Sequence, residues 1–159
     1  LLNDYVNSYD DKRAAMSQSS FSKQEQLQSC TCRNHLNQTV DWFIIYKLPR
    51  LNTSENLNIK NGTGYMYLDS SSQISEWHLS PHSIKTNLSM AAITLNSLYE
   101  NTASSYIYYS DQPPNQNFSL TFGHTKGVLA FDNQTGFWLM HTVPRFPQIY
   151  NAGYYYPDT

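Results

Sequence analysis

The segment from residue 40 to residue 48 constrains the fold of this chain more than any other part of the sequence. It reads Val-Asp-Trp-Phe-Ile-Ile-Tyr-Lys-Leu and is followed at once by Pro49. Apolar residues occupy both sets of alternating positions, and a proline ends the run, which is typical of a strand that is covered on both faces. The run therefore predicts a central strand of a sheet.

Other segments add strands and one helix around this strand. Residues 64–68 and 106–109 read as strands, and residues 124–131 and 137–143 read as a strand pair around a hairpin turn at 132–136. Residues 87–100 predict a helix whose apolar stripe consists of Leu88, Ala91, Leu95, Leu98 and Tyr99. The sequence thus predicts a mixed, β-rich α/β fold.

Length and composition favour a single folded unit preceded by an extension. The chain has 159 residues, 40% of them hydrophobic, which suits one domain with a real core. Residues 1–31 are polar and carry no sustained helical or strand period, so we expect a flexible extension there and the folded domain in residues 32–159. No apolar run approaches the ~20 residues of a membrane-spanning helix, so we expect no membrane association.

The sequence is rich in acceptor sites for N-linked glycans. Composition alone accounts for about two or three Asn-x-Ser/Thr motifs in such a chain, whereas six are present. The excess predicts a secreted or lysosomal protein. The candidate glycosylation sites are Asn37, Asn52, Asn61, Asn87, Asn117 and Asn133.

The two cysteines give a weaker signal. Cys30 and Cys32 are separated by one residue, and a disulfide across so short a span is strained in most backbone conformations. A zinc site that adds His35 to this pair lacks a fourth ligand. The pairing of the two cysteines stays open, because their partners could lie outside the chain. We expect no metal site and no cofactor.

The charge balance depends strongly on pH. The formal charge of -2 at neutral pH argues against a protein that binds nucleic acid through bulk positive potential. Protonation of the five histidines moves this charge to +3 before any carboxylate is protonated. A polyanionic partner is thus favoured in acid.

A His-x-Lys pair carries the chemistry that the sequence suggests. On a strand, residues two apart point the same way, so His124 and Lys126 should project from one face while Thr125 points to the other. An imidazole nitrogen can attack phosphorus, and an ammonium can balance charge on the non-bridging oxygens, without a metal. By itself, however, His-x-Lys is a weak motif that a protein of this size often holds by accident.

The sequence around this pair resembles the deoxyribonuclease II family. The resemblance is carried by four runs that occur in the family's order and together cover roughly residues 32–157. These runs are residues 40–49 (VDWFIIYKLP), 111–114 (DQPP), 123–129 (GHTKGVL) and 136–147 (GFWLMHTVPRFP). Because four separate segments match, an accidental His-x-Lys pair becomes the less favoured interpretation.

The resemblance implies a phospholipase D-like half-domain with a mixed central sheet flanked by helices. It implies metal-independent cleavage of DNA in acid that leaves 3′-phosphate ends, with two His-x-Lys motifs sharing one cleft. One histidine attacks phosphorus and the other protonates the leaving oxygen. His124 and Lys126 match the first motif, and the role of His124 as nucleophile or acid stays open. Cys32 resembles a family cysteine whose disulfide partner lies beyond residue 159.

The second motif has no counterpart in residues 1–159, which leaves several hypotheses open. Two copies of the chain could form a dimer with two His-x-Lys pairs. A separate carboxy-terminal half could supply the second pair. Alternatively, the chain is a catalytically inactive secreted paralogue that binds nucleic acid or a host protein, or an unrelated secreted β-rich binding domain.

Three other residues are weaker candidates. Thr142 could offer a hydroxyl to phosphate, and Lys47 could help to hold DNA, although a threonine within a strand or a lysine at its end is usually only structural or solvated. His141 lies on the strand opposite the motif, where hairpin register decides which face it occupies. We expect a structural or rim role for it. Asp132 follows Lys126 one residue later than the phospholipase D pattern expects and is assigned no role.

Overall fold

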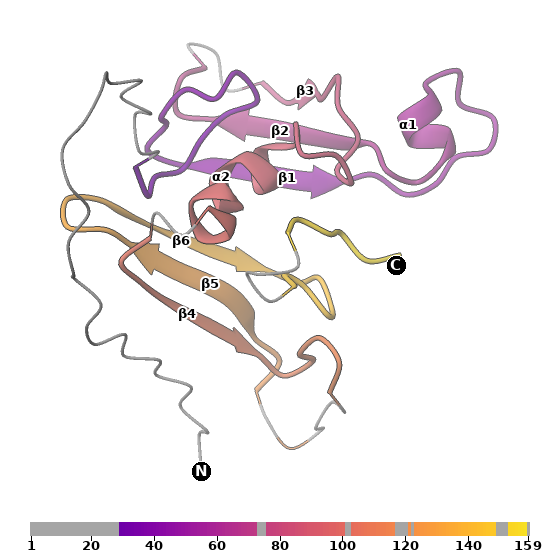
Figure 1. Cartoon of the computed structure of the whole chain (residues 1–159). Helices are drawn as coiled ribbons and strands as arrows, with labels where there is room; N and C mark the ends of the chain where they lie inside the picture. The colour runs from indigo at the N-terminus through magenta and orange to yellow at the C-terminus, as the bar shows by residue number, and fades with distance from the viewer. Residues whose placement is uncertain are drawn as a thin grey trace, which may run out of the picture.

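The computed structural model describes residues 29–72, 76–100, 103–116, 121, 123–148 and 153–158. Most of the expected extension, residues 1–28, and the glycosylation candidate Asn117 lie outside this part of the chain. The mixed, β-rich α/β class is confirmed (Figure 1). The elements are β1 (Phe43–Lys47), α1 (Leu57–Lys60), β2 (Tyr65–Asp69), β3 (His78–Leu79), α2 (Met90–Tyr99), β4 (Ser105–Ser110), β5 (Lys126–Phe131) and β6 (Gly136–His141).

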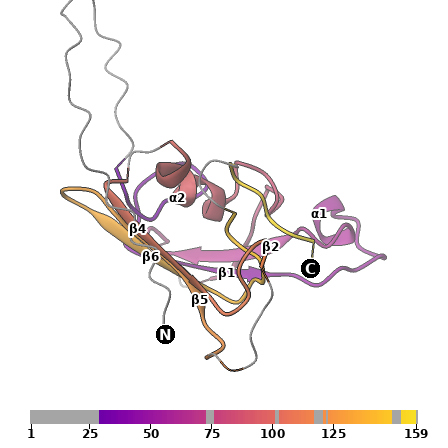
Figure 2. The ribbon, with the colours of Figure 1, turned by 60° about the horizontal axis from the view of Figure 1, so that its bottom comes forward.

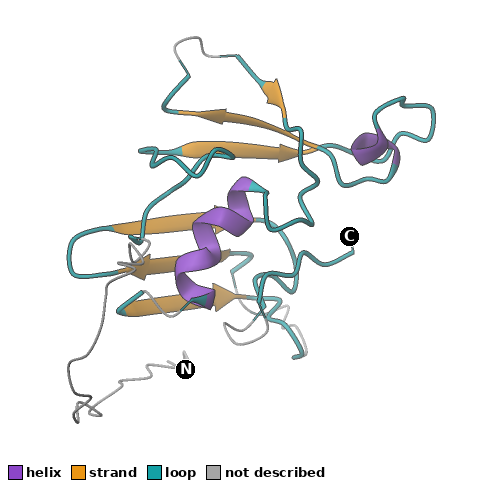
Figure 3. Ribbon diagram, turned by 45° about the horizontal axis from the view of Figure 1, so that its top comes forward, coloured by secondary structure: helices purple, strands orange, loops and turns teal. Residues whose placement is uncertain are grey.

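The strands form two three-stranded antiparallel sheets, in the orders β1-β2-β3 and β4-β5-β6. We expected one mixed central sheet, whereas the hydrogen-bonded ladders of the described residues divide into two. The sheets lie side by side, with β1 and β6 as the neighbouring edge strands (Figures 1 and 3). The predicted hairpin between β5 and β6 is confirmed by their continuous register.

Strand β1 corrects the expectation of a central strand, because it lies at the edge of its sheet. Its side chains alternate between two faces of the sheet, but only one of these faces packs against the core. Phe43 and Ile45 pack against the core, while Ile44 and Tyr46 on the other face are exposed. The run is thus apolar on both faces although the structure covers only one of them.

Helix α2 begins later than the sequence suggested. Ser89 is its N-cap, with an extended backbone and a side-chain oxygen that accepts a hydrogen bond from Ala92 N. Leu88 therefore precedes the helix and is 56% exposed, which corrects its assignment to the apolar stripe. The short elements α1 and β3 were not predicted, because four and two residues are too few to show a period.

The core forms where α2 meets the two sheets. The helix crosses one face of the β4-β5-β6 sheet and lies on one side of the strands (Figures 2 and 3). Buried side chains from both sheets, the helix and the connecting segments form one cluster. Its members are Cys30, Tyr65, Ile84, Met90, Leu95, Leu98, Val128, Ala130, Phe137, Phe146 and Tyr156.

The cysteines are both free thiols. Cys30 is fully buried, and its Sγ donates to Ser97 Oγ at 3.4 Å. Burial raises the pKa of the Cys30 thiol, and this effect exceeds the opposite effect of the hydrogen bond with Ser97. Burial also raises the pKa of Cys32. Within the described ranges, no three His, Cys, Asp or Glu side chains gather as metal ligands would.

Every glycosylation candidate within the described residues is exposed, namely Asn37, Asn52, Asn61, Asn87 and Asn133. Over the same part of the chain, no helix has the length and apolar character needed to cross a bilayer.

A comparison of two leucines tests whether α2 organises the core. Leu95 is 0% exposed, so we expect Leu95→Ala to lower the free energy of unfolding by about 2–5 kcal/mol through lost burial and the cavity left behind. Leu88→Ala removes the same atoms from the surface just before the helix and should change stability by less than about 0.5 kcal/mol. Urea unfolding measures both, and equal losses would contradict the assignment of the core.

Candidate functional site

One carboxylate joins the two residues of the His-x-Lys pair. Asp111 Oδ1 accepts a hydrogen bond from Lys126 Nζ at 2.7 Å, and Asp111 Oδ2 lies 2.7 Å from His124 Nδ1. The strands set this geometry, since Ser110 at the end of β4 pairs with Lys126 at the start of β5. Asp111 is the next residue, and its backbone N–H donates to Thr125 O.

Burial differs sharply among the three side chains. Asp111 is buried and Lys126 is 3% exposed, whereas 74% of the His124 side chain is accessible. The hydrogen bond from Lys126 is the largest cause that lowers the pKa of Asp111; burial opposes it, and the hydrogen bond with His124 adds to it. Asp111 therefore stays ionised in mild acid.

The charge state of Asp111 fixes the orientation of the imidazole. An ionised carboxylate can only accept hydrogen bonds, so Nδ1 of His124 must carry the hydrogen in this contact. The other ring nitrogen, Nε2, is then left for a substrate on the exposed side of the ring. This arrangement is a common way to prepare one nitrogen of a histidine for reaction.

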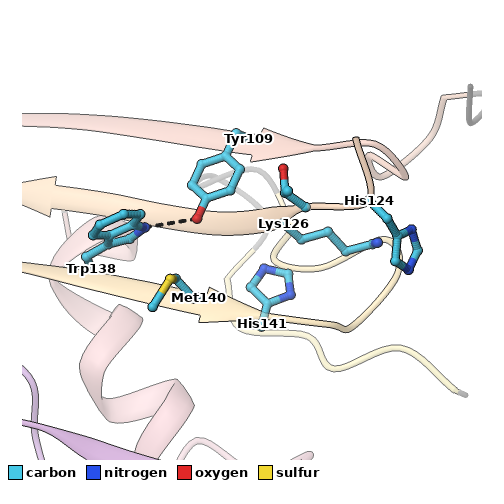
Figure 4. A pocket seen from close by; sticks show the side chains of 7 residues that line it. Tyr109, His124, Lys126, Trp138, Met140 and His141 are labelled. Atoms are coloured by element: carbon cyan, nitrogen blue, oxygen red, sulfur yellow. Dashed lines mark hydrogen bonds between the residues drawn. The ribbon is translucent and has the colours of Figure 1, made fainter. Parts of the chain in front are cut away.

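An open pocket of about 400 Å³ lies against this pair. Three of its lining residues come from the segment that contains the motif, and the others come from β4 and β6 (Figure 4). The lining residues are Tyr109, His124, Thr125, Lys126, Trp138, Met140 and His141. The pocket thus combines ionisable groups with aromatic and thioether side chains.

The register of the hairpin places His141 directly opposite Lys126, on the same face of the sheet. His141 Nδ1 accepts a hydrogen bond from Val143 N at 3.2 Å, and its Nε2 is buried with no hydrogen-bond partner among the described residues. Burial is the main cause, and the charge of Lys126 the second, that lowers the pKa of His141 to about 4. The ring is therefore largely neutral in mild acid.

Two of the three weaker candidates do not line this pocket, whereas His141 does. Thr142 follows β6 and is exposed, and Lys47 ends β1 in the other sheet; neither lines the pocket. Asp132, which was assigned no role, organises the hairpin loop by accepting hydrogen bonds from Cys30 N, Gln134 N and Thr135 N. These bonds lower its pKa to about 2.

Sequence reasoning missed Asp111 as a site residue. Its run Asp111-Gln112-Pro113-Pro114 entered only as one of the four runs that resemble the family, and Asp111 itself was given no role. The contact with His124 spans 13 residues and the contact with Lys126 spans 15, so only the pairing of β4 with β5 brings the groups together. The aromatic side of the pocket was missed for the same reason.

Comparison with known proteins places the sequence of this chain in a family. The family model described as Deoxyribonuclease II matches residues 31–159. The chain is 40% identical over 136 residues to Plancitoxin-1 of Acanthaster planci, covering 82% of this chain and 37% of that protein. It is 40% identical over 135 residues to Deoxyribonuclease-2-beta of Homo sapiens, covering 81% and 36%.

A third relative, Cell death-related nuclease 6 of Caenorhabditis elegans, is 39% identical over 120 residues, which cover 73% of this chain and 31% of that protein. The chain therefore spans about a third of the length of these curated relatives. Its matched region contains β1 to β6 and the Asp111, His124 and Lys126 contacts. This chain belongs to the deoxyribonuclease II family.

Proposed function

We propose that this chain is part of a deoxyribonuclease that hydrolyses DNA phosphodiesters in acid without a metal ion. The observation that carries the proposal is the Asp111 carboxylate, which bonds both His124 Nδ1 and Lys126 Nζ at 2.7 Å. Membership of the deoxyribonuclease II family supports DNA as the substrate, since several relatives bear that activity in their names. His124 and Lys126 are the proposed catalytic residues.

The proposed reaction has two steps at phosphorus. In the first, Nε2 of one histidine forms a bond to phosphorus while the bond from phosphorus to O5′ breaks, and a second histidine gives its proton to O5′. In the second, that histidine takes a proton from water, whose oxygen attacks phosphorus and releases the first histidine and a 3′-phosphate. His124 suits either role, because both use an accessible Nε2.

Lys126 contributes charge to this reaction from a buried position. A buried ammonium acts on charge in the adjacent pocket more strongly than an exposed one, because the surroundings screen it less. Its three N–H donors exceed the one that Asp111 Oδ1 accepts. Phosphate oxygens that carry the developing negative charge would approach this side of the pocket.

The second histidine would come from another polypeptide, either a second copy of this chain in a dimer or a separate carboxy-terminal half. The exposed position of His124 at an open pocket supports such a shared site. We also propose a secreted or lysosomal location, which the exposed glycosylation candidates and the family support. Contacts of Thr142 and Lys47 with DNA remain part of this proposal.

Replacement of His124 tests the proposed catalytic nitrogen. We expect His124→Ala to reduce plasmid nicking at pH 5 in chelator by at least about a hundredfold, because no other group replaces Nε2. His78→Ala is the control, since His78 is an exposed histidine on β3 in the other sheet. The assay compares rates at matched oligomeric state, followed by sedimentation. Equal rates for wild type and His124→Ala would remove His124 from catalysis.

The same experiment separates the assembly hypotheses. A dimeric species that nicks DNA would support two copies of the chain. Monomer at all concentrations with no nicking would contradict that arrangement, and activity restored by a separately produced carboxy-terminal half would support the second. DNA binding without cleavage that is unaffected by His124→Ala would instead favour the inactive binding paralogue.

Replacement of Asp111 tests the positioning of His124. We expect Asp111→Asn to lower kcat for nicking by about a hundredfold or more with little change in KM. The asparagine amide can donate a hydrogen bond as well as accept one, so it no longer requires Nδ1 of His124 to carry the hydrogen. Asp41→Asn changes an exposed carboxylate next to β1 and should have no effect. Urea unfolding of each variant checks the fold, and an unchanged kcat for folded Asp111→Asn would contradict the assignment.

The neutral His141 gives the folded state a defined pH dependence. Its folded pKa of about 4 lies below its ordinary value of 6.5, so the unfolded chain binds this proton first as pH falls. We expect the free energy of unfolding to fall by roughly 2 kcal/mol between pH 7 and pH 5 from this residue alone. Urea unfolding at the two pH values measures this change. In His141→Phe the free energy of unfolding should fall by roughly 2 kcal/mol less than in the wild type. An identical loss in wild type and His141→Phe would exclude a buried neutral His141.

A further inference from the structure

The face of the β4-β5-β6 sheet that points away from α2 carries large uncharged side chains. The register places Ile107, Leu129 and Trp138 side by side, and Tyr109, Gly127 and Met140 in the next row toward the motif. Trp138 and Met140 are 60% and 68% exposed, so this face presents an indole and a thioether to solvent. Exposed apolar patches of this kind often mark a binding site.

The indole of Trp138 is held by a specific partner across the sheet. Its Nε1 donates to Tyr109 Oη at 2.9 Å, so the two rings are joined across β5 (Figure 4). This reach requires Gly127 between them, because a Cβ at that position would lie 2.3 Å from Tyr109 Oη and 2.5 Å from Tyr109 Cζ. The missing side chain thus makes room for a fixed pair of rings.

These rings belong to the same pocket as the proposed phosphate site. Tyr109, Trp138 and Met140 line one part of it, and His124 and Lys126 line another (Figure 4). Trp138 pairs with Leu129, three residues along β5 from Lys126, so the indole lies about 10 Å along the strand from the lysine and on the opposite face of the sheet. The open pocket is nevertheless lined by both groups.

We propose that Tyr109, Trp138 and Met140 form a stacking site for an unpaired nucleobase beside the phosphate bound at His124. The inference rests on the proposed function, since it assigns a base to the nucleotide whose phosphate meets the His-x-Lys pair. Every base has a flat face that stacks on an aromatic ring, so such a site would hold DNA without regard to sequence. It would favour single strands, because a paired base is already stacked.

The charge distribution supports a base rather than a second phosphate at this part of the pocket. The two rows of this face contain no Lys, Arg, Asp or Glu, so they offer neither a partner nor a repulsion to charge. A base is the uncharged and flat part of a nucleotide. The shared pocket distinguishes these rings from exposed apolar residues elsewhere, such as Trp42 beside β1.

A pair of oligomers with equal charge tests this assignment. Binding of single-stranded hexathymidylate and of an abasic hexamer with the same phosphates would be measured by fluorescence anisotropy at pH 5 in chelator, with cleavage blocked by non-hydrolysable linkages. We expect the wild-type chain to bind the thymidylate at least about fivefold more tightly than the abasic strand. Trp138→Leu should reduce that ratio to about one, and Trp138→Phe, which keeps a ring, should preserve most of it.

Trp42→Leu is the matched control, because it removes another exposed indole, 47% exposed and next to β1 of the other sheet, and should keep the wild-type ratio. A ratio of one in the wild type, with His124→Ala still weakening the abasic strand, would overturn the base site and leave the proposed function standing. A ratio that Trp138→Leu leaves unchanged, together with loss of a dimer in sedimentation, would overturn it in favour of a protein contact. Binding of neither oligomer would overturn both proposals.

Discussion

The ion pair between Asp111 and Lys126 is the interaction on which the candidate site depends. A buried ammonium without a partner would cost several kcal/mol, so the carboxylate is a condition for placing Lys126 in the interior at all. The same carboxylate uses its other oxygen to hold His124. One residue therefore satisfies a buried charge and orients an exposed ring.

That pair is possible because the backbone ladder fixes its two ends. Ser110 and Lys126 are cross-strand partners, and Asp111 follows as β4 ends. The ladder is in turn held by the core, where Val128 and Ala130 on the face shared with Lys126 belong to the same buried cluster as Leu95 and Leu98 of α2. Packing of one helix on one sheet face thus determines the position of side chains at the sheet's end, a few residues away.

The two faces of the β4-β5-β6 sheet serve different purposes. The face toward α2 excludes water and supports Lys126 and His141 at its end. The opposite face keeps Trp138 and Met140 accessible and uses Gly127 to bring Tyr109 close to the indole. Side chains alternate along β5 and β6, so the ionisable groups and the aromatic groups lie on opposite faces of the sheet. Both groups line one pocket near the start of β5 and the end of β6.

The sequence by itself determined the local elements and the chemistry of the motif. Alternating apolar residues predicted five of the strands approximately, the recurrence of Ala91, Leu95 and Leu98 predicted the helix, and His124 with Lys126 indicated a candidate phosphate site. Such patterns depend on neighbours within a few residues. Other features depend on contacts between distant segments. These are the division of the strands into two sheets, the exposed face of β1, the hydrogen bonds of Asp111 with His124 and Lys126, and the pairing of Tyr109 with Trp138. Only the tertiary structure decided these, because hydrogen-bond register and side-chain packing across strands leave no periodic trace in the sequence.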